Sequence, residues 1–286
     1  MPSSSGYVRH FVACNQHDLS GYVPFLIGGK RYGRMKKDNA AFLLEETDLF
    51  AALGDGLALA DRFADFSTRS EALKQATLAL SARQKRSALR REMYAIVEKW
   101  GDEPLAQIDR AAVPWFGVRA WGVHVNGFVR KEDGIHLWIG ERAANLVAYP
   151  GKLDNMIGGG QPIGLTPEEN LCKEAKEEAG IDAALALTAR KVRTMNYLFE
   201  RPDGLRTDTL FLYDLELPES VTPRNTDGEV AAFTLMPLPQ VADLIRNTDK
   251  FKFNCPMVIV DFMMRHGAIT QQDAEHEELR KWLPQA

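Results

Sequence analysis

The second half of the chain alternates hydrophobic and polar positions over several short runs. A period of two is typical of half-buried β-strands. Together with a short strand expected before a glycine-rich segment, the predicted strands span residues 121–130, 136–141, 155–157, 191–199, 208–217 and 230–236. Helical signals fall between and after them, at residues 167–179, 239–246 and 256–265. Strands interleaved with helices predict an α/β/α sandwich.

The first half of the chain mixes the two patterns. A hairpin is predicted where two β-prone runs flank a Gly-Gly pair, at residues 22–27 and 30–34. An amphipathic helix is predicted at residues 70–84. Two runs stay open between structures: residues 42–44 fit a strand or a helix start, and residues 90–100 fit helical or alternating spacing.

The length of the chain, 286 residues, exceeds that of a typical single domain. Two prolines within residues 102–118 mark the junction that we expect between two domains. The prediction is an N-terminal α+β domain over residues 1–117, a larger α/β domain over 118–270 and a C-terminal helical tail over 271–286.

The helix expected at residues 167–179 carries its own start and stop signals. Thr166 is a candidate N-cap, Pro167 suits the first helical position and Glu169 completes a capping box. Gly180 stands where a left-handed residue ends a helix. These local signals predict a short helix directly after a glycine-rich turn.

Three carboxylates on this helix, Glu174, Glu177 and Glu178, form the main candidate for chemistry. We expect them within one arc of the helix, opposite a packing side that includes Leu171 and Cys172. Like charges at this spacing repel, and a bound Mg²⁺ or Mn²⁺ would compensate them. By itself the hexamer KEAKEE favours a solvated acidic helix face, because such hexamers are common on helix surfaces.

The wider string from Gly159 to Ile181 resembles the Nudix box, in which a glycine, a glutamate, an Arg-Glu pair and a Glu-Glu pair recur at fixed spacing. Gly159 matches the opening glycine, and the helix glutamates match theirs. Two positions depart from the box, because Leu165 replaces the first glutamate and Lys173 replaces the arginine. Lys173 keeps the positive charge but lacks the planar fork that would orient a neighbour.

The resemblance covers about residues 118–266 and implies a Nudix-type sandwich with a mixed sheet. It also implies a metal-dependent hydrolase that cleaves a diphosphate linkage, with Mg²⁺ or Mn²⁺ held by the three glutamates and by a carbonyl near Gly159. Lys173 would orient the carboxylates of these glutamates. The segments at residues 22–29, 121–128 and 150–155 are further similar to the Nudix proteins related to thiamine pyrophosphokinase. That similarity implies thiamine diphosphate or its oxidised analogues as substrates.

Other roles in the reaction have weaker signals. Glu229, in a late Asp-Gly-Glu-Val loop, is the candidate base that takes a proton from water, although it also fits a turn residue. Glu200 is a weaker candidate for the same role. The candidate substrate-binding residues are Arg142, Lys152, Asn155 and Tyr197. His124 fits a packed or hydrogen-bonded strand residue.

Two other readings of the same box stay open. A Nudix domain can also act as a sensor that binds a phosphorylated metabolite without turnover. An isomerase acting on isopentenyl diphosphate is a further alternative, but that branch needs a cysteine ahead of the box. The sequence has none between Cys14 and Cys172.

Composition and charge narrow the classes of partner. The net charge of −4 gives no basic field for nucleic acid, and we expect none as a partner. We interpret the cluster Arg83, Lys85, Arg86, Arg90 and Arg91 as a solvated helix face. Three scattered cysteines cannot build a disulfide framework. With no hydrophobic leader or membrane-length apolar run, we predict a cytoplasmic protein that does not enter a membrane. The sequence does not predict an oligomeric state.

Overall fold

The N-terminal half of the computed structural model, which describes residues 6–85 and 89–283, is built around a small sheet. The predicted hairpin is present as β1 (Tyr22–Ile27) and β2 (Lys30–Lys36). β4 (Gly56–Leu59) pairs parallel with β1, and β3 (Phe50–Leu53) completes the order β2-β1-β4-β3. α2 (Lys37–Glu46) and α3 (Phe66–Gln84) supply side chains to the hydrophobic core of this half.

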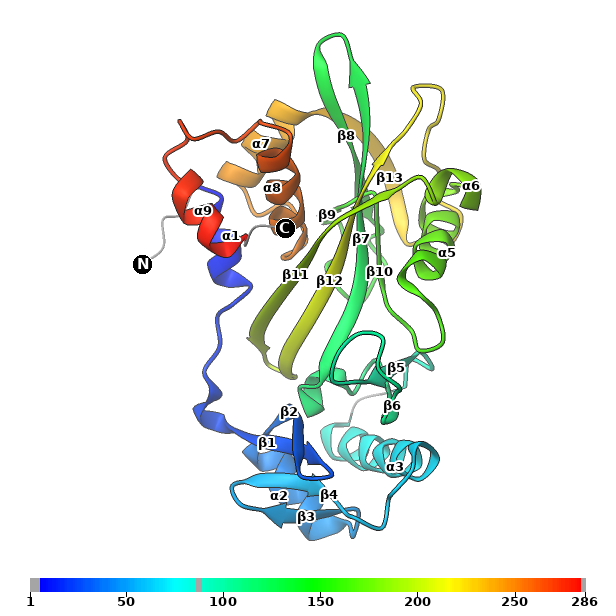
Figure 1. The fold of residues 1–286 in the computed structure, drawn as a ribbon, viewed down its shortest axis with the longest axis vertical. Coiled ribbons are helices and arrows are strands. Elements are labelled where there is room, and N and C mark those ends of the chain that lie inside the picture. The colour runs from blue at the N-terminus through cyan, green and yellow to red at the C-terminus, as the bar shows by residue number, and fades with distance from the viewer. Residues whose placement is uncertain (1–5, 86–88, 284–286) are drawn as a thin grey trace.

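The structure decides the open runs of this half. Residues 42–44 lie inside α2, and the stretch 90–100 contains a strand, β5 (Met93–Ile96), paired with β6 (Ala106–Asp109). A short helix, α4 (Val113–Phe116), then leads into the second half (Figure 1). Other short elements are α1 (Val8–Ala13) and a 3₁₀ turn at Leu19–Gly21.

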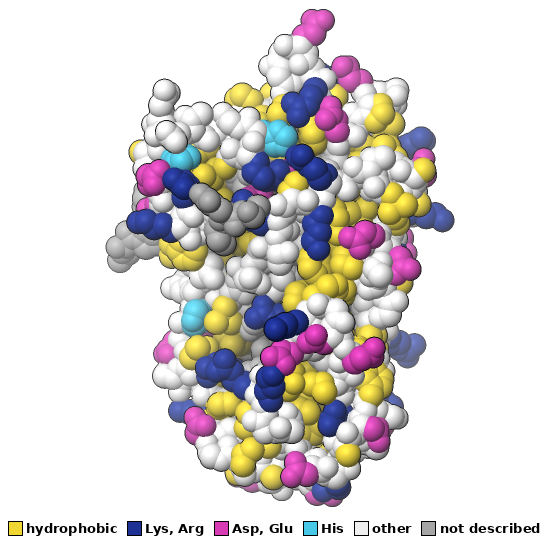
Figure 2. Space-filling model, in the orientation of Figure 1, with side chains coloured by type: hydrophobic (Ala, Val, Ile, Leu, Met, Phe, Trp, Pro, Cys, Tyr) yellow, Lys and Arg dark blue, Asp and Glu magenta, His cyan; other side chains and the backbone are white. Residues whose placement is uncertain are grey.

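The prediction that the basic cluster lies on a helix face is wrong for most of its members. α3 ends at Gln84, so Arg83 lies on the helix, whereas Arg90 and Arg91 lie in the connection that follows. Arg86 lies outside the described residues. Figure 2 shows charged side chains of both signs interspersed over the visible face.

The second half is a mixed sheet of seven strands among the described residues. Its main path runs β11-β12-β7-β8-β13, with β10 paired to β7 and β9 paired to β8. β7 and β12 run parallel, whereas the other pairs are antiparallel. The strands are β7 (Arg119–Lys131), β8 (Gly134–Arg142), β9 (Leu153–Asp154), β10 (Ile157–Gly160), β11 (Arg190–Arg201), β12 (Gly204–Glu216) and β13 (Val230–Pro237).

Helices cover both faces of this sheet, which confirms the predicted α/β/α sandwich (Figure 1). On one face lie α5 (Pro167–Ala179) and α6 (Ala183–Ala186). On the other lie α7 (Leu238–Asn247) and α8 (Cys255–Arg265). Within the described ranges, no helix is both long and apolar enough to cross a membrane.

The two ends of the chain meet on the second half. α1, which the sequence assigns to the N-terminal domain, packs against α8 and against α9 (His276–Trp282) of the predicted helical tail. Its buried side chains Val8 and Phe11 belong to the core beneath α7 and α8. The predicted boundary near residue 118 falls between α4 and β7. The domain limits stay a prediction, with α1 as the segment that crosses them.

Candidate active site

Helix α5 has the bounds and the caps that the sequence predicts. The Thr166 hydroxyl accepts a hydrogen bond from the Glu169 amide at 3.1 Å, and the Glu169 carboxylate accepts one from the Thr166 amide at 2.8 Å. These two hydrogen bonds lower the pKa of Glu169. Gly180 ends the helix in the left-handed region, with φ of 62°.

The predicted division of α5 into a packing face and a carboxylate face is wrong. Glu174 and Glu178 are each only 8% exposed and lie on the buried side of the helix with Leu171 and Ala175, whereas Glu177 is exposed. The reason is the helical period, because residue 178 comes seven positions, or nearly two turns, after residue 171. Cys172 is half-buried at the side of the same core.

Glu178 is a buried carboxylate that accepts a hydrogen bond from a backbone amide. Its Oε2 accepts from the Gly158 N–H at 2.8 Å. Burial raises the pKa of Glu178 well above its usual range, and the nearby charges of Glu174 and Asp154 raise it further. The backbone hydrogen bond and Lys252 act in the opposite direction but do not offset burial.

Glu174 and Glu177 share one cation. Lys173 Nζ lies 3.0 Å from Glu174 Oε1 and 2.8 Å from Glu177 Oε2. Burial still raises the pKa of Glu174, although Lys173 lowers it. Lys173 therefore occupies the position from which it can hold two of the three predicted carboxylates.

The glycines of β10 allow α5 to approach the sheet. A Cβ on Gly159 would overlap the carboxyl carbon of Glu174, so a larger residue there would displace the carboxylate. The structure thus brings together five of the predicted site residues: Gly159, Lys173, Glu174, Glu177 and Glu178.

The N-terminal half also touches this site, which sequence reasoning missed. A Cβ on Gly160 would overlap the hydroxyl oxygen of Tyr94 in β5, and the Ile163 amide donates to the Met93 carbonyl at 2.8 Å. The charge of Glu92 contributes to the raised pKa of Glu174. No local signal in the sequence links β5 to the box, because the contact joins segments about seventy residues apart.

Glu229 lies on an exposed loop beside the end of α5. The Thr226 hydroxyl of this loop donates to the Lys176 and Glu177 carbonyls at 2.9 and 2.6 Å. The Glu229 amide donates to Asp227 Oδ1 at 2.8 Å, as in a turn. Within the described residues, no hydrogen bond or ion pair joins the Glu229 carboxylate to the α5 glutamates. The weaker candidate, Glu200, instead accepts from the Tyr22 hydroxyl at 3.0 Å.

The four predicted substrate-binding side chains all bond to other parts of the protein. Arg142 pairs with Asp154 at 3.0 Å, and Lys152 donates to the Asp249 carbonyl at 2.6 Å. Asn155 Oδ1 lies 2.8 Å from His124 Nδ1, and Tyr197 donates to Asp208 at 2.7 Å. None of these contacts reaches α5, so their role in substrate binding stays a prediction.

His124, Asp154 and Cys255 form a buried group with the residue types of a metal site, and their ligand atoms lie within 4.8 Å of one another. The Cys255 thiol donates to Asp154 Oδ1 at 2.7 Å, while Lys252 and Arg142 lie 3.1 and 3.0 Å from Asp154 Oδ2. Burial alone would raise the pKa of Asp154, but Lys252, His124 and the thiol lower it to about 2. Two cationic side chains already neutralise this carboxylate, so the group is a structural network.

Comparison with known proteins identifies the family. Residues 120–255 match the NUDIX domain, and residues 6–120 match a domain of unknown function, DUF4743. Nudix hydrolase 20, chloroplastic, of Arabidopsis thaliana is 35% identical over 291 residues, which cover 98% of this chain and 78% of that protein. The chain belongs to the Nudix hydrolase family.

A second relative agrees with this family assignment. Nudix hydrolase 24, chloroplastic, of Arabidopsis thaliana is 35% identical over 283 residues, with the same coverage of 98% and 78%. Among solved structures, DR0079 from Deinococcus radiodurans covers 59% of this chain and 98% of its own, with 23% identity and a TM-score of 0.43. The similarity to the two Arabidopsis thaliana proteins therefore extends over nearly the whole chain.

Nudix enzymes generally use divalent metal ions, and the α5 site offers a fitting set of donors. Its side chains are oxygen donors without a thiol or imidazole, which suits a hard cation. Burial raises the pKa values of Glu174 and Glu178, which means that their charged forms are disfavoured and that Lys173 offsets this cost only in part. A bound divalent cation would stabilise those charged forms. In the described part of the chain, the buried Asn170 Oδ1 and Gln161 Oε1 beside β10 also lack a donor.

Proposed function

We propose that this Nudix hydrolase cleaves a diphosphate linkage in a small phosphorylated metabolite, with a divalent cation held by Glu174, Glu177, Glu178 and the Gly159 carbonyl. The observation that carries the proposal is the buried Glu174–Glu178 pair on a capped helix against a glycine strand. Mg²⁺, or Mn²⁺ in its place, would neutralise negative charge on the diphosphate oxygens.

The residues around the cation site have distinct tasks in this proposal. The Gly158 amide fixes Glu178, and Lys173 fixes the carboxylates of Glu174 and Glu177. These contacts hold the ligand oxygens in place before substrate arrives, which reduces the cost of ordering them during the reaction.

The proposed reaction is hydrolysis of the P–O–P bridge. A water oxygen bonds to phosphorus as the bridging P–O bond breaks, and Glu229 accepts the proton that the water loses. The loop that carries Glu229 is attached to the end of α5 by Thr226. This attachment supports Glu229 over Glu200, whose carboxylate bonds to Tyr22.

Thiamine diphosphate and its oxidised analogues are the proposed substrates, with the monophosphates as products. The support is the similarity of residues 22–29, 121–128 and 150–155 to the thiamine-pyrophosphokinase-related Nudix proteins. For substrate contacts we keep Arg142, Lys152, Asn155 and Tyr197 as proposals. Each would have to exchange its present partner for the ligand.

A cytoplasmic setting also stays a proposal. Its support is that all three cysteines are free thiols, as expected in a reducing compartment. Two relatives carry the description chloroplastic in their names, so the compartment of this chain needs its own measurement.

The test is a Mg²⁺-dependent hydrolysis assay, with the phosphorylated products separated and quantified by chromatography, across thiamine diphosphate, its oxidised analogues, nucleotide sugars, dinucleotides and nucleoside triphosphates. Glu178→Gln should lower the rate at least about a hundredfold, because it removes a charged ligand. Glu168→Gln, an exposed glutamate in the first turn of the same helix, is the matched control and should retain the rate.

The outcomes separate the readings. Turnover that survives both chelation and Glu178→Gln would contradict the proposed site. Cleavage of nucleotides alone would reject the thiamine assignment and leave the hydrolase. Tight binding of a phosphorylated metabolite with no turnover of any substrate would favour the sensor.

A further inference from the structure

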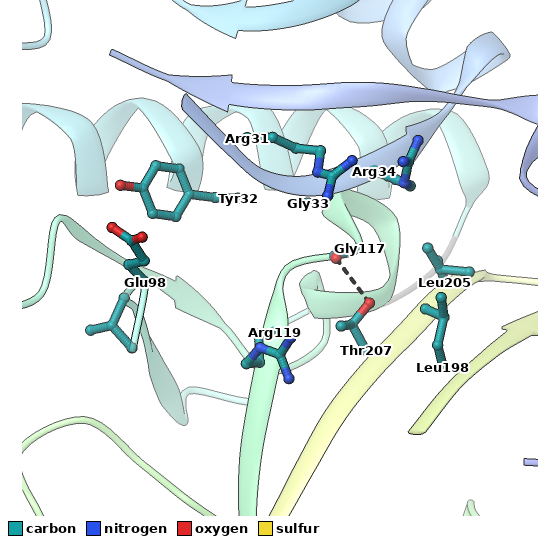
Figure 3. A pocket seen from close by; sticks show the side chains of 11 residues that line it. Arg31, Tyr32, Gly33, Arg34, Glu98, Gly117, Arg119, Leu198, Leu205 and Thr207 are labelled. Carbon is teal, nitrogen blue, oxygen red and sulfur yellow. Dashed lines mark hydrogen bonds between the residues drawn. The ribbon is translucent and has the colours of Figure 1, made fainter. Parts of the chain in front are cut away.

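A cavity of about 300 Å³ lies at the junction of the two halves of the molecule (Figure 3). Arg31 and Arg34 border it from β2, and Arg119 borders it from the start of β7. Within the described part of the chain, its lining includes no residue of β10 or α5. The cavity is therefore distinct from the proposed catalytic site.

In the part of the chain that the structure describes, no carboxylate pairs with the three arginines of this cavity. Among the described residues, the side chains of Arg31 and Arg34 have no hydrogen bond or ion pair. Arg119 donates to two neutral oxygens, Asn196 Oδ1 at 3.2 Å and Thr209 Oγ1 at 2.6 Å. Three like charges around one small space repel, and an anion between them would remove that repulsion.

An acidic residue does line the cavity, but it has its own cation. Glu98 forms an ion pair with Lys30, which precedes Arg31 on β2. Lys30 and Glu98 thus neutralise each other. The net charge that faces the cavity is that of the three guanidinium groups.

The backbones of the two halves are closely packed beside this cavity. Gly117, between α4 and β7, lies so close to β2 that a Cβ on it would overlap the Arg34 carbonyl oxygen. Its φ of 57° is also a conformation that other residues rarely adopt. Because the connection that leads to Arg119 lies directly against β2, arginines from both halves line the same space.

The remaining walls are apolar or aromatic. Val97, Leu198 and Leu205 line the cavity, and the half-buried Tyr32 stands at one side (Figure 3). The Thr207 hydroxyl donates to the Gly117 carbonyl at 3.3 Å. A ligand that fits must combine a strongly anionic group with an apolar or aromatic part.

We propose that this junction cavity binds a small-molecule phosphate monoester that carries an aromatic or apolar group. Guanidinium forks match phosphate oxygens in geometry and charge, and a dianion satisfies three arginines better than a monoanion does. The bound ester would contact β2 on one side and β7 on the other, so it would also stabilise the two halves against separation.

The experiment uses the full chain carrying Glu178→Gln, in the presence of a chelator, so that binding at α5 does not contribute. Phenyl phosphate is titrated by calorimetry, with benzoate as the monoanionic comparison. We expect saturable one-to-one binding with Kd of about 1 mM or tighter. Benzoate should bind at least about tenfold more weakly.

Variants assign the binding to the cavity. Arg34→Gln and Arg119→Gln should each weaken phenyl phosphate binding about tenfold or more. Arg190→Gln, an exposed arginine at the other end of β11, is the matched control and should bind as the parent does. Arg34→Lys keeps the charge without the fork and should fall between the two.

Thermal unfolding gives an independent reading. Phenyl phosphate should raise the Tm of the parent and of Arg190→Gln, and should leave that of Arg34→Gln unchanged. The proposal is overturned if phenyl phosphate does not bind, if benzoate binds equally well, or if Arg190→Gln weakens binding as much as Arg34→Gln. Because the parent is already Glu178→Gln, none of these results bears on the proposed hydrolysis.

Discussion

Two buried carboxylates on opposite faces of the same sheet differ in their partners. Asp154 faces α8 and is bonded to Arg142, Lys252 and the Cys255 thiol, and its pKa is about 2. Glu178 faces β10 from α5 and accepts a hydrogen bond from the Gly158 amide, and burial raises its pKa well above the usual range.

The comparison distinguishes a structural charge from a functional one. Both groups are 8% exposed, so burial alone does not separate them. Asp154 already has two cationic partners, Arg142 and Lys252, and a metal ion would compete with them. Glu178 and its neighbour Glu174 have negative charge that the protein compensates only in part, which is the condition under which a divalent cation binds favourably.

The largest expected effect comes from breaking the structural side of this comparison. Asp154→Asn should lower the free energy of unfolding by about 3–5 kcal/mol, because Arg142 and Lys252 would lose their buried partner. Urea unfolding of this variant is measured beside Asp55→Asn, an exposed aspartate in the turn between β3 and β4, which should change little.

The stabilisation by Asp154 should also depend on pH. The pKa of Asp154 is lowered in the folded protein, so its stabilisation is present above the unfolded value of about 3.9 and is lost as pH falls toward 2. Asp154→Asn should therefore show a shallower loss of stability between these two pH values. An equal slope in both proteins would contradict the pairing of Asp154 with its cations.

The functional side of the comparison should respond in the opposite way. Without metal, the free energy of unfolding of Glu178→Gln should equal that of the parent or exceed it by up to about 1 kcal/mol, because a neutral amide replaces a buried carboxylate. Mg²⁺ at a hundred times its Kd should stabilise the parent by about 2.7 kcal/mol. Thermal unfolding with and without Mg²⁺ measures the effect of the substitution and the stabilisation by Mg²⁺. If Mg²⁺ stabilised Glu178→Gln as much as the parent, Glu178 would not be a ligand.

The functional helix could be predicted from the sequence because its signals are local. Thr166, Glu169 and Gly180 determine where α5 begins and ends within fifteen residues, and the structure agrees at both ends. The predicted faces of α5 are wrong because Glu178 follows Leu171 by nearly two turns and therefore lies on the same, buried side. The caps of a helix are encoded more directly than its contacts.

The structural network and the junction cavity could not be predicted in this way. The Cys255–Asp154 hydrogen bond joins residues 101 positions apart, and the Tyr94–Gly160 contact joins the two halves of the molecule. Such pairs depend on how the sheet and helices pack, and no periodicity or cap in a single sequence reports that packing. Arg142 has the same limitation, because its position after a strand does not reveal Asp154 as its partner.

Removing Lys173 should have the smallest effect on stability and on the hydrolysis rate. Lys173 forms ion pairs with Glu174 and Glu177. The Lys173 side chain is 40% exposed and that of Glu177 is 48% exposed, so solvent weakens these pairs. Lys173→Met should change the free energy of unfolding by less than about 1 kcal/mol and lower the hydrolysis rate about fivefold. Lys176→Met, on the exposed side of the same helix, is the matched control and should retain the rate. Equal rates for the two variants would mean that Lys173 does not orient the carboxylates, whereas a loss as large as that of Glu178→Gln would make it essential to the site.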